Sequence, residues 1–158
     1  MGRMEIQKLK LLTSKQRDQI NQLWNEEYPI KLNNYFSLLL EGVENYHHYI
    51  VEDSDSNIVA WAVDFEKENE IRFSIIVKSR YQGKGWGSLI IAKLQSEVDE
   101  FYGWVIDHNN SIKANGENYI SPLPFYIKQG FSVLSDKRIE SEMLSATKVH
   151  WISKNEKT

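Results

Sequence analysis

A glycine-rich turn near the middle of the chain constrains the fold more than any other feature of the sequence. The apolar run Ile75–Val77 leads into a turn with three alternate glycines, Gly83, Gly85 and Gly87. The apolar residues that then repeat at helical spacing are Ile90, Ile91, Leu94, Val98 and Phe101. Glycine lets the backbone approach a ligand closely and adopt positive φ, so successive N–H groups can converge on an anion at a helix start. The segment therefore predicts a strand, an anion-binding turn and a helix.

The spacing of the glycines distinguishes between known phosphate-binding turns. A P-loop requires a glycine at the position that Lys78 occupies, and a dinucleotide fingerprint requires a glycine where Ser88 stands. Both patterns fail. The pattern that fits is Gln/Arg-x-x-Gly-x-Gly/Ala, which is met by Gln82, Gly85 and Gly87.

Hydrophobic periodicity and turn residues predict the remaining elements and hence the fold class. Thr13 or Ser14 is expected to cap the first helix, Pro29 to end it, and Asn33 or Asn34 to cap the second. The expected ranges are 4–12 (strand), 14–28 and 35–40 (helices), 48–52, 57–66 and 71–77 (strands), 86–99 (helix), 104–106 (strand), 122–128 (helix), and 131–134 and 146–151 (strands). The order βααβββαβαββ predicts an α+β fold with a mixed, mostly antiparallel central sheet flanked by helices. No linker interrupts it, so a single domain is expected over residues 1–158.

Composition excludes several classes of function. The chain has no cysteine, which excludes disulfides, thiolate metal sites and a cysteine nucleophile. Its net charge of −3 is scattered along the sequence, so a nucleic-acid partner is not expected. Its apolar runs are far shorter than the roughly 20 residues that span a bilayer, so no membrane contact is expected. These features favour a cytoplasmic protein without a bound metal.

A second motif gives the chain a family resemblance. The segment Phe125–Phe131 contains Tyr126-x-x-x-Gly130-Phe131, and it follows the glycine motif at a distance that leaves room for a helix and a strand. With the Gln82-x-x-Gly85-x-Gly87 motif and the order of the elements, this pattern resembles the GCN5-related N-acetyltransferase (GNAT) superfamily. The resemblance covers residues 4 to 152.

The resemblance implies acetyl-CoA as the acyl donor and an amine as the acceptor. The residues that it places at the coenzyme are Ile75, Ile76, Val77, Gln82, Gly83, Lys84, Gly85, Trp86, Gly87 and Ser88. The N–H groups of the turn would hold the pyrophosphate, and the strand would pair with the pantetheine arm where it parts from the strand ending at Ile106. A backbone N–H near Ile76 would stabilise the developing oxyanion, and the Tyr126 hydroxyl would protonate or hydrogen-bond the leaving sulfur.

The residue that deprotonates the acceptor amine is less well defined by the sequence. Asp107 follows the strand beside the expected gap, and Glu27 lies at the corner between the first two helices, so both are candidate bases. Glu70 is one residue out of register with the position that carries a base in some relatives. For Tyr126 the alternative is a purely structural core aromatic beside Phe125.

The long polar segment 107–119 departs from the usual family pattern. It could cover the acceptor and form a polar, aromatic pocket with Trp24, Tyr28 and Tyr35, or it could be a loose surface loop. The expected acceptor is a small-molecule or peptide amine. The alternative functions are a non-catalytic acyl-CoA-binding or sensing domain and a phosphate- or nucleotide-binding module. A homodimer through the last strands is also compatible with the sequence.

Overall fold

The computed structural model describes residues 4–154, so the ends of the expected domain, residues 1–3 and 155–158, lie outside it. The strands are β1 (Ile6–Leu9), β2 (Tyr46–Glu52), β3 (Ile58–Lys67), β4 (Glu70–Val77), β5 (Glu100–Ile106), β6 (Ser132–Glu140) and β7 (Ser145–Ile152). The helices are α1 (Ser14–Glu27), α2 (Phe36–Leu39), α3 (Trp86–Glu97) and α4 (Leu123–Lys128), with short 3-10 turns at Ile30–Leu32 and Ser79–Tyr81. The strands form one sheet in the order β1-β2-β3-β4-β5-β7-β6, which confirms the expected α+β fold and its sequence of helices and strands.

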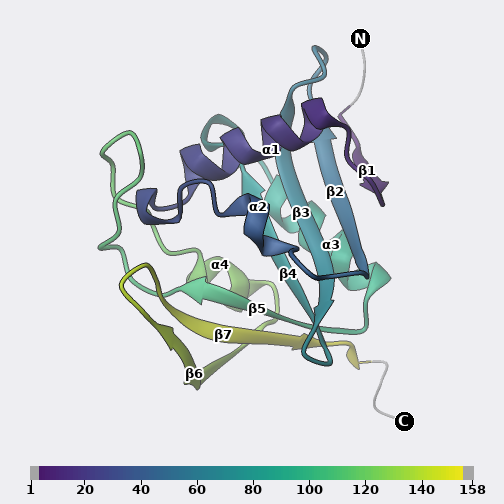
Figure 1. Cartoon of the computed structure of the whole chain (residues 1–158). Coiled ribbons are helices and arrows are strands. Elements are labelled where there is room, and N and C mark those ends of the chain that lie inside the picture. The colour runs from purple at the N-terminus through teal and green to yellow at the C-terminus, as the bar shows by residue number, and fades with distance from the viewer. Residues whose placement is uncertain (1–3, 155–158) are drawn as a thin grey trace.

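Helices cover both faces of the sheet. Helices α1 and α2 lie across one face, and α3 lies behind the other (Figure 1). The core on the first face includes Ile20, Leu23, Trp24, Phe36, Trp61, Val63 and Ile76. The core on the second face includes Ile90, Ile91, Leu94, Phe73, Phe101, Phe131 and Val149. The segment Ile58–Phe65 of β3 is buried along its whole length because it packs against both helical layers. No helix among residues 4–154 is long and apolar enough to span a membrane.

The sheet is split in its middle. All neighbouring strands pair in antiparallel fashion except β4 and β5, which are parallel and share a single registered pair, Arg72 with Tyr102. Beyond that pair the two strands diverge toward their carboxyl ends. The expectation that the strand of Ile75 and the strand of Ile106 part from each other is therefore confirmed.

Two local expectations were wrong. The apolar stripe assigned to the helix expected over 86–99 extended to Val98 and Phe101, but α3 ends at Glu97 and Phe101 lies in β5. Phe101 pairs across the sheet with Trp151 and packs edge-on against Phe73 at 5.3 Å between ring centroids. These sheet contacts override a spacing that is also compatible with a helix.

The second correction concerns the start of α2. Asn33 and Asn34 do not cap this helix, because its N-cap is Tyr35 and no side chain donates or accepts a capping hydrogen bond there. Asn34 instead adopts the left-handed conformation, with φ of 66°, and accepts a hydrogen bond from the Asn25 side chain at 2.9 Å. Asparagine tolerates this conformation better than most residues, so Asn34 turns the chain rather than capping the helix.

Candidate active site

A large cavity opens where β4 and β5 part. Its volume is about 920 Å³. Its walls come from the end of α1 and from α2, from β4 and β5, from the 82–88 turn, from residues 119–122 and from α4. One cavity thus brings together the two sequence motifs and the helix corner that the sequence associated with the acceptor.

The peptide groups of β4 alternate between β3 and this cavity. The N–H of Lys78 donates to the carbonyl of Val59 across 2.8 Å, so even-numbered residues of β4 direct their peptide groups toward β3. Ile76 is one of them. The peptide groups of Ile75 and Val77 therefore face the gap, where β5 has no residue in register with them.

Side chains already use the carbonyl oxygens on this edge. The Tyr28 hydroxyl donates to the carbonyl of Ile75 at 3.4 Å, and the Gln82 amide donates to the carbonyl of Val77 at 2.8 Å. The N–H groups of Ile75 and Val77 therefore fit the polar arm of a ligand better than the N–H of Ile76. The sequence predicted an oxyanion donor in the neighbourhood of Ile76, and the peptide orientations favour the N–H groups of its two neighbours.

The turn that follows β4, residues 82–87, is named here the phosphate loop. Gly83 and Gly85 adopt positive φ, of 74° and 92°, and a Cβ built on either would have no atom within 4 Å. Gly85 is the N-cap of α3 and no side chain caps this helix start. The first N–H groups of α3 thus have no side-chain acceptor, and Lys84 beside them is exposed. The loop fits a phosphate-bearing ligand, as an uncapped and open helix N-terminus should.

Gly87 has a different physical requirement. A Cβ at this position would lie 3.1 Å from the ring of Phe125, which belongs to α4. A side chain here would therefore press on the Phe125 ring, so glycine favours the close approach of α3 and α4 at this point. The two sequence motifs touch at this point, and the contact fixes the position of Tyr126 relative to the phosphate loop.

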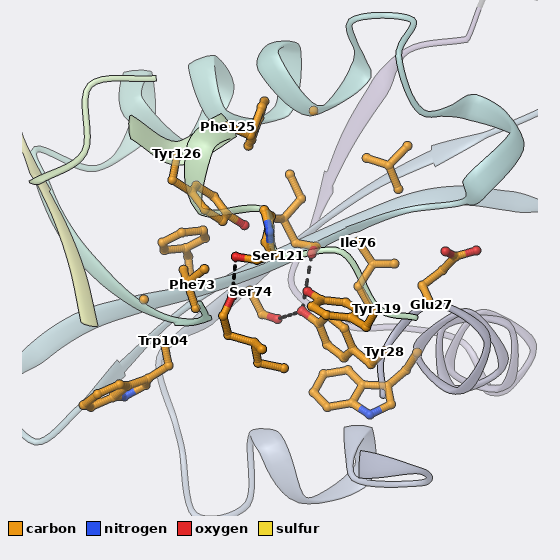
Figure 2. A pocket seen from close by; sticks show the side chains of 18 of the residues that line it. Glu27, Tyr28, Phe73, Ser74, Ile76, Trp104, Tyr119, Ser121, Phe125 and Tyr126 are labelled. Carbon is orange, nitrogen blue, oxygen red and sulfur yellow. Dashed lines mark hydrogen bonds between the residues drawn. The ribbon is translucent and has the colours of Figure 1, made fainter. Parts of the chain in front are cut away.

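Three tyrosines from distant parts of the chain point into the cavity. Figure 2 shows Tyr126 entering from α4, Tyr28 from the end of α1 and Tyr119 from the long loop. The Tyr28 hydroxyl shares a hydrogen bond of 3.0 Å with Ser74, whereas no protein hydrogen bond involves the Tyr126 hydroxyl among residues 4–154. Burial is the main cause that raises the pKa of Tyr126 well above its ordinary value, and the neighbouring Tyr28 and Tyr119 raise it further. Tyr126 is therefore a neutral O–H donor at physiological pH.

Glu27 lines the same cavity, but its carboxylate is engaged. One oxygen accepts the backbone N–H of Ser79 at 3.0 Å, and the other accepts the Ser79 hydroxyl at 2.7 Å. Lys113 of the long loop lies 3.5 Å from the carboxylate, and both side chains of this pair are largely buried. Figure 2 shows Glu27 at the end of α1, on the side of the cavity where Tyr119 lies. Glu27 connects α1 to the turn after β4 and to the long loop.

Replacing Glu27 with alanine is expected to lower the free energy of unfolding by about 3 kcal/mol, because it leaves a buried cation and two donors without their acceptor. For a domain of this size the melting temperature should fall by about 6–12 °C. The matched variant Glu27→Gln keeps a hydrogen-bond acceptor and should lose less stability. If Glu27 is a general base, Glu27→Gln should instead reduce kcat about 100-fold or more at a temperature where it is folded.

The other candidate base lies off the cavity. Asp107 is not among the lining residues, and Arg138 donates to both of its carboxylate oxygens, at 2.8 and 3.1 Å. The hydrogen bonds from Arg138 are also the main cause that holds the pKa of Asp107 below its ordinary value. A base role for Asp107 stays a prediction, and the geometry gives it no support. The other carboxylate considered, Glu70, accepts from Lys148 at 2.7 Å and does not line the cavity either.

The long segment after β5 is an ordered part of the cavity wall. The N–H of Ile30 donates to the carbonyl of Ile112 at 2.7 Å, which docks the loop on the corner after α1. A small antiparallel turn follows, in which Ile112 bridges to Asn118. The chain then returns to the cavity, where Ser121 donates to the carbonyl of Ile106 at 2.6 Å. The end of the loop therefore forms part of the cavity wall and supplies Tyr119 to it.

The comparisons with known proteins agree with this geometry. A family model described as an acetyltransferase (GNAT) domain matches residues 44–133. The chain therefore belongs to the GNAT family, as its motifs predicted, and it is an N-acetyltransferase by fold and family. A search of curated protein sequences finds no match. Among residues 4–154, no group of three metal-binding side chains comes together.

Several solved structures share the fold. The ribosomal-protein-S18-alanine N-acetyltransferase of Escherichia coli has a TM-score of 0.66 at 16% identity, with 96% of this chain and 95% of that chain covered. A phosphinothricin acetyltransferase from Sinorhizobium meliloti in complex with AcCoA has a TM-score of 0.61 at 12% identity, with 95% and 88% covered. The spermidine/spermine N-acetyltransferase of Vibrio cholerae has a TM-score of 0.59 at 15% identity, with 94% and 92% covered. At these identities the similarity establishes the fold and leaves the acceptor open.

Proposed function

We propose that the chain, as a single cytoplasmic domain, binds acetyl-CoA in the gap between β4 and β5 and transfers the acetyl group to an amine. The observation that carries this proposal is the split sheet. Peptide groups of Ile75 and Val77 without a strand partner, an uncapped helix start at Gly85 and the buried hydroxyl of Tyr126 all border one cavity. A ligand with a phosphate at one end and an extended polar arm fits this arrangement.

When bound, acetyl-CoA supplies a thioester whose C–S bond breaks as the C–N bond to the acceptor forms. The phosphate loop would hold the pyrophosphate, and the edge of β4 would hold the pantetheine arm. The N–H groups of Ile75 and Val77 are the available donors for negative charge on the carbonyl oxygen, an interaction worth about 3–4 kcal/mol in comparable sites. The Tyr126 Oη holds a proton at neutral pH and would give it to the leaving sulfur, so that the second product is a neutral thiol.

An ammonium acceptor must lose one proton before it attacks and a second as the amide forms, and the second replaces the proton that Tyr126 gives to the sulfur. No unpaired carboxylate of the described residues lines the cavity to take the first proton. The hydroxyls of Tyr28 and Ser74, which share a hydrogen bond, offer a path along which that proton can pass to water. Burial is the main cause that raises the pKa of Tyr28, so this hydroxyl relays a proton without being ionised itself. By their names, the similar structures acetylate ribosomal-protein-S18 alanine, phosphinothricin, or spermidine and spermine, so the proposed acceptor is a small-molecule or peptide amine.

Calorimetric titration of the purified protein tests the donor. Acetyl-CoA and free coenzyme A are expected to bind, and ATP is expected not to, because ATP lacks the pantetheine arm that pairs with β4. Release of free thiol should then be followed with a panel of amines. If neither form of the coenzyme binds, the assignment of the phosphate loop is wrong.

A second candidate function is a non-catalytic sensor of acyl-CoA. The engaged state of Glu27 favours it, because this is the cavity's one carboxylate among the described residues. A sensor would bind acetyl-CoA tightly and release no thiol with any amine. Turnover with any amine above the rate of spontaneous hydrolysis would exclude this candidate.

A further inference from the structure

The charged side chains on the cavity wall favour one class of acceptor. Among the described residues, its wall carries three ionisable side chains of permanent charge, Glu27, Lys67 and Arg72. The carboxylate of Glu27 is satisfied by Ser79 and Lys113. The remaining charges are both positive. Arg72 has carboxylates of Glu68 and Glu70 at 3.5 and 3.7 Å, but these residues do not line the cavity. The wall formed by the described residues thus presents cations and no free anion, which favours an anion over a polycation.

Arg72 lies on the acceptor side of the gap. It is an even-numbered residue of β4, and alternation along the strand places its side chain on the same face as that of Ser74. Ser74 in turn contacts Tyr28 at 3.0 Å. Two residues along a strand span about 7 Å, so an ion held by Arg72 would lie a short chain length from the reacting amine.

The guanidinium of Arg72 is poorly satisfied by the protein. Its side chain is only 14% exposed, and among residues 4–154 no hydrogen bond involves it. Its Nε is buried without a partner and away from the cavity, so the terminal nitrogens are the donors that a ligand would meet. Its nearest acidic neighbours are Glu68 at 3.5 Å and Glu70 at 3.7 Å. A guanidinium has five donors in a planar fork that matches a carboxylate, and leaving them unpaired in a buried place is costly.

The neighbouring carboxylates do not supply hydrogen-bond acceptors to the Arg72 guanidinium. Glu70 gives its closer contact to Lys148, at 2.7 Å through Oε1, and its Oε2 is buried without a hydrogen bond to Arg72 or to any other described residue. Glu68 is largely exposed at the turn between β3 and β4. Lys67 adds a second cation at the same end of the cavity, is exposed, and has no ion-pair partner among the described residues. Arg72 therefore combines burial, terminal nitrogens that make no hydrogen bond within the described residues, and a place on the cavity wall.

We propose that Arg72 binds an anionic group on the acceptor, so that the preferred substrate is a short amino compound with a carboxylate-like group at its far end. This inference rests on the proposed function, because it names the acceptor class of the same site. Lys67 lies near the solvent and attracts the anion, whereas Arg72 pairs with it inside the cavity. Diamines and polyamines, which would place a second cation near Arg72, are disfavoured.

Matched acceptors test this assignment. ω-Amino acids from β-alanine to 6-aminohexanoate are compared with their carboxamides and with diamines of equal length, and thiol release gives kcat/KM. The best acid should exceed its amide by about 30-fold, the effect of one charge-assisted hydrogen-bonded pair. In Arg72→Met this preference should fall to less than about 3-fold, and Arg72→Lys should restore part of it because it keeps the charge without the fork.

The controls separate the two proposals. Arg17→Met removes one exposed positive charge elsewhere and should leave the preference unchanged. Lys67→Ala should weaken the preference by a smaller, salt-sensitive factor. Suppose that acetyl-CoA binds and amines react. If the carboxamides or diamines then react as well as the acids, or if Arg72→Met keeps the preference for the acids, the assignment of an anionic acceptor is wrong and the acetyltransferase proposal stands. If acetyl-CoA does not bind at all, both are wrong.

Discussion

Replacing Gly85 with aspartate is expected to lower the affinity for acetyl-CoA about 100-fold or more. Gly85 caps α3 in the left-handed conformation, and the space in front of its Cα is open. A carboxylate there would occupy the proposed pyrophosphate position and would accept the N–H groups of the helix start itself, as a side-chain cap does. Loss of hydrogen bonds to a charged ligand, at about 1.5–3 kcal/mol each, and repulsion between like charges both act in this direction. The dissociation constant measured by calorimetry is the readout.

The isosteric variant Gly85→Asn is the matched control. It has nearly the same shape and the same unfavourable backbone conformation, but it brings no charge, so it should lose clearly less affinity than Gly85→Asp. Gly42→Asp reports only the loss of stability that comes from an aspartate at positive φ, because Gly42 also has positive φ, of 76°, and open space around it. An unchanged affinity in Gly85→Asp would remove the pyrophosphate from this loop. Gly87→Glu is less informative, because its side chain would collide with Phe125 whether or not a ligand binds.

The sequence predicted the parts of the site that depend on local backbone geometry. The phosphate loop follows from glycine spacing between a strand and a helix, and the positive φ of Gly83 and Gly85 is what that spacing requires. Tyr126 followed from a motif at a fixed distance from the loop. The reason that the two motifs occur together, the close contact of Gly87 with Phe125, became visible only in the folded chain.

The parts that depend on long-range contacts were missed or misread. Glu27 was a candidate base because of its helix corner, and its partner Ser79 lies 52 residues away along the chain. The entry of Tyr119 into the cavity depends on the docking of an irregular loop on Ile30. Hydrophobic periodicity cannot predict such a contact. One signal was available for the acceptor side. Glu70, Arg72 and Ser74 alternate with apolar residues in a strand that lies in the middle of the sheet, and polar residues in such a strand face a cavity or a partner.

Replacing Tyr126 with phenylalanine should separate chemistry from packing. The ring packs against Phe73 and Phe131 at 5.5 and 5.4 Å between centroids, and phenylalanine retains these contacts. The hydroxyl has no protein partner among residues 4–154, so its removal leaves no protein group unsatisfied. Stability should therefore change by less than about 1 kcal/mol, and the affinity for acetyl-CoA should stay within about 2-fold.

The rate should respond differently. If Tyr126 Oη protonates the leaving sulfur, Tyr126→Phe should lower kcat about 100-fold, the lower end of the range for a positioned acid. Because burial raises the pKa of Tyr126, no ionisation of this phenol should appear in the pH–rate profile of the wild type below about pH 10, and the variant should keep the same profile at a lower rate. Tyr28→Phe is the comparison within the cavity, since it removes a hydroxyl that is bonded to Ser74 rather than free. A variant at position 126 with full kcat would make Tyr126 a core aromatic and leave protonation of the sulfur to water.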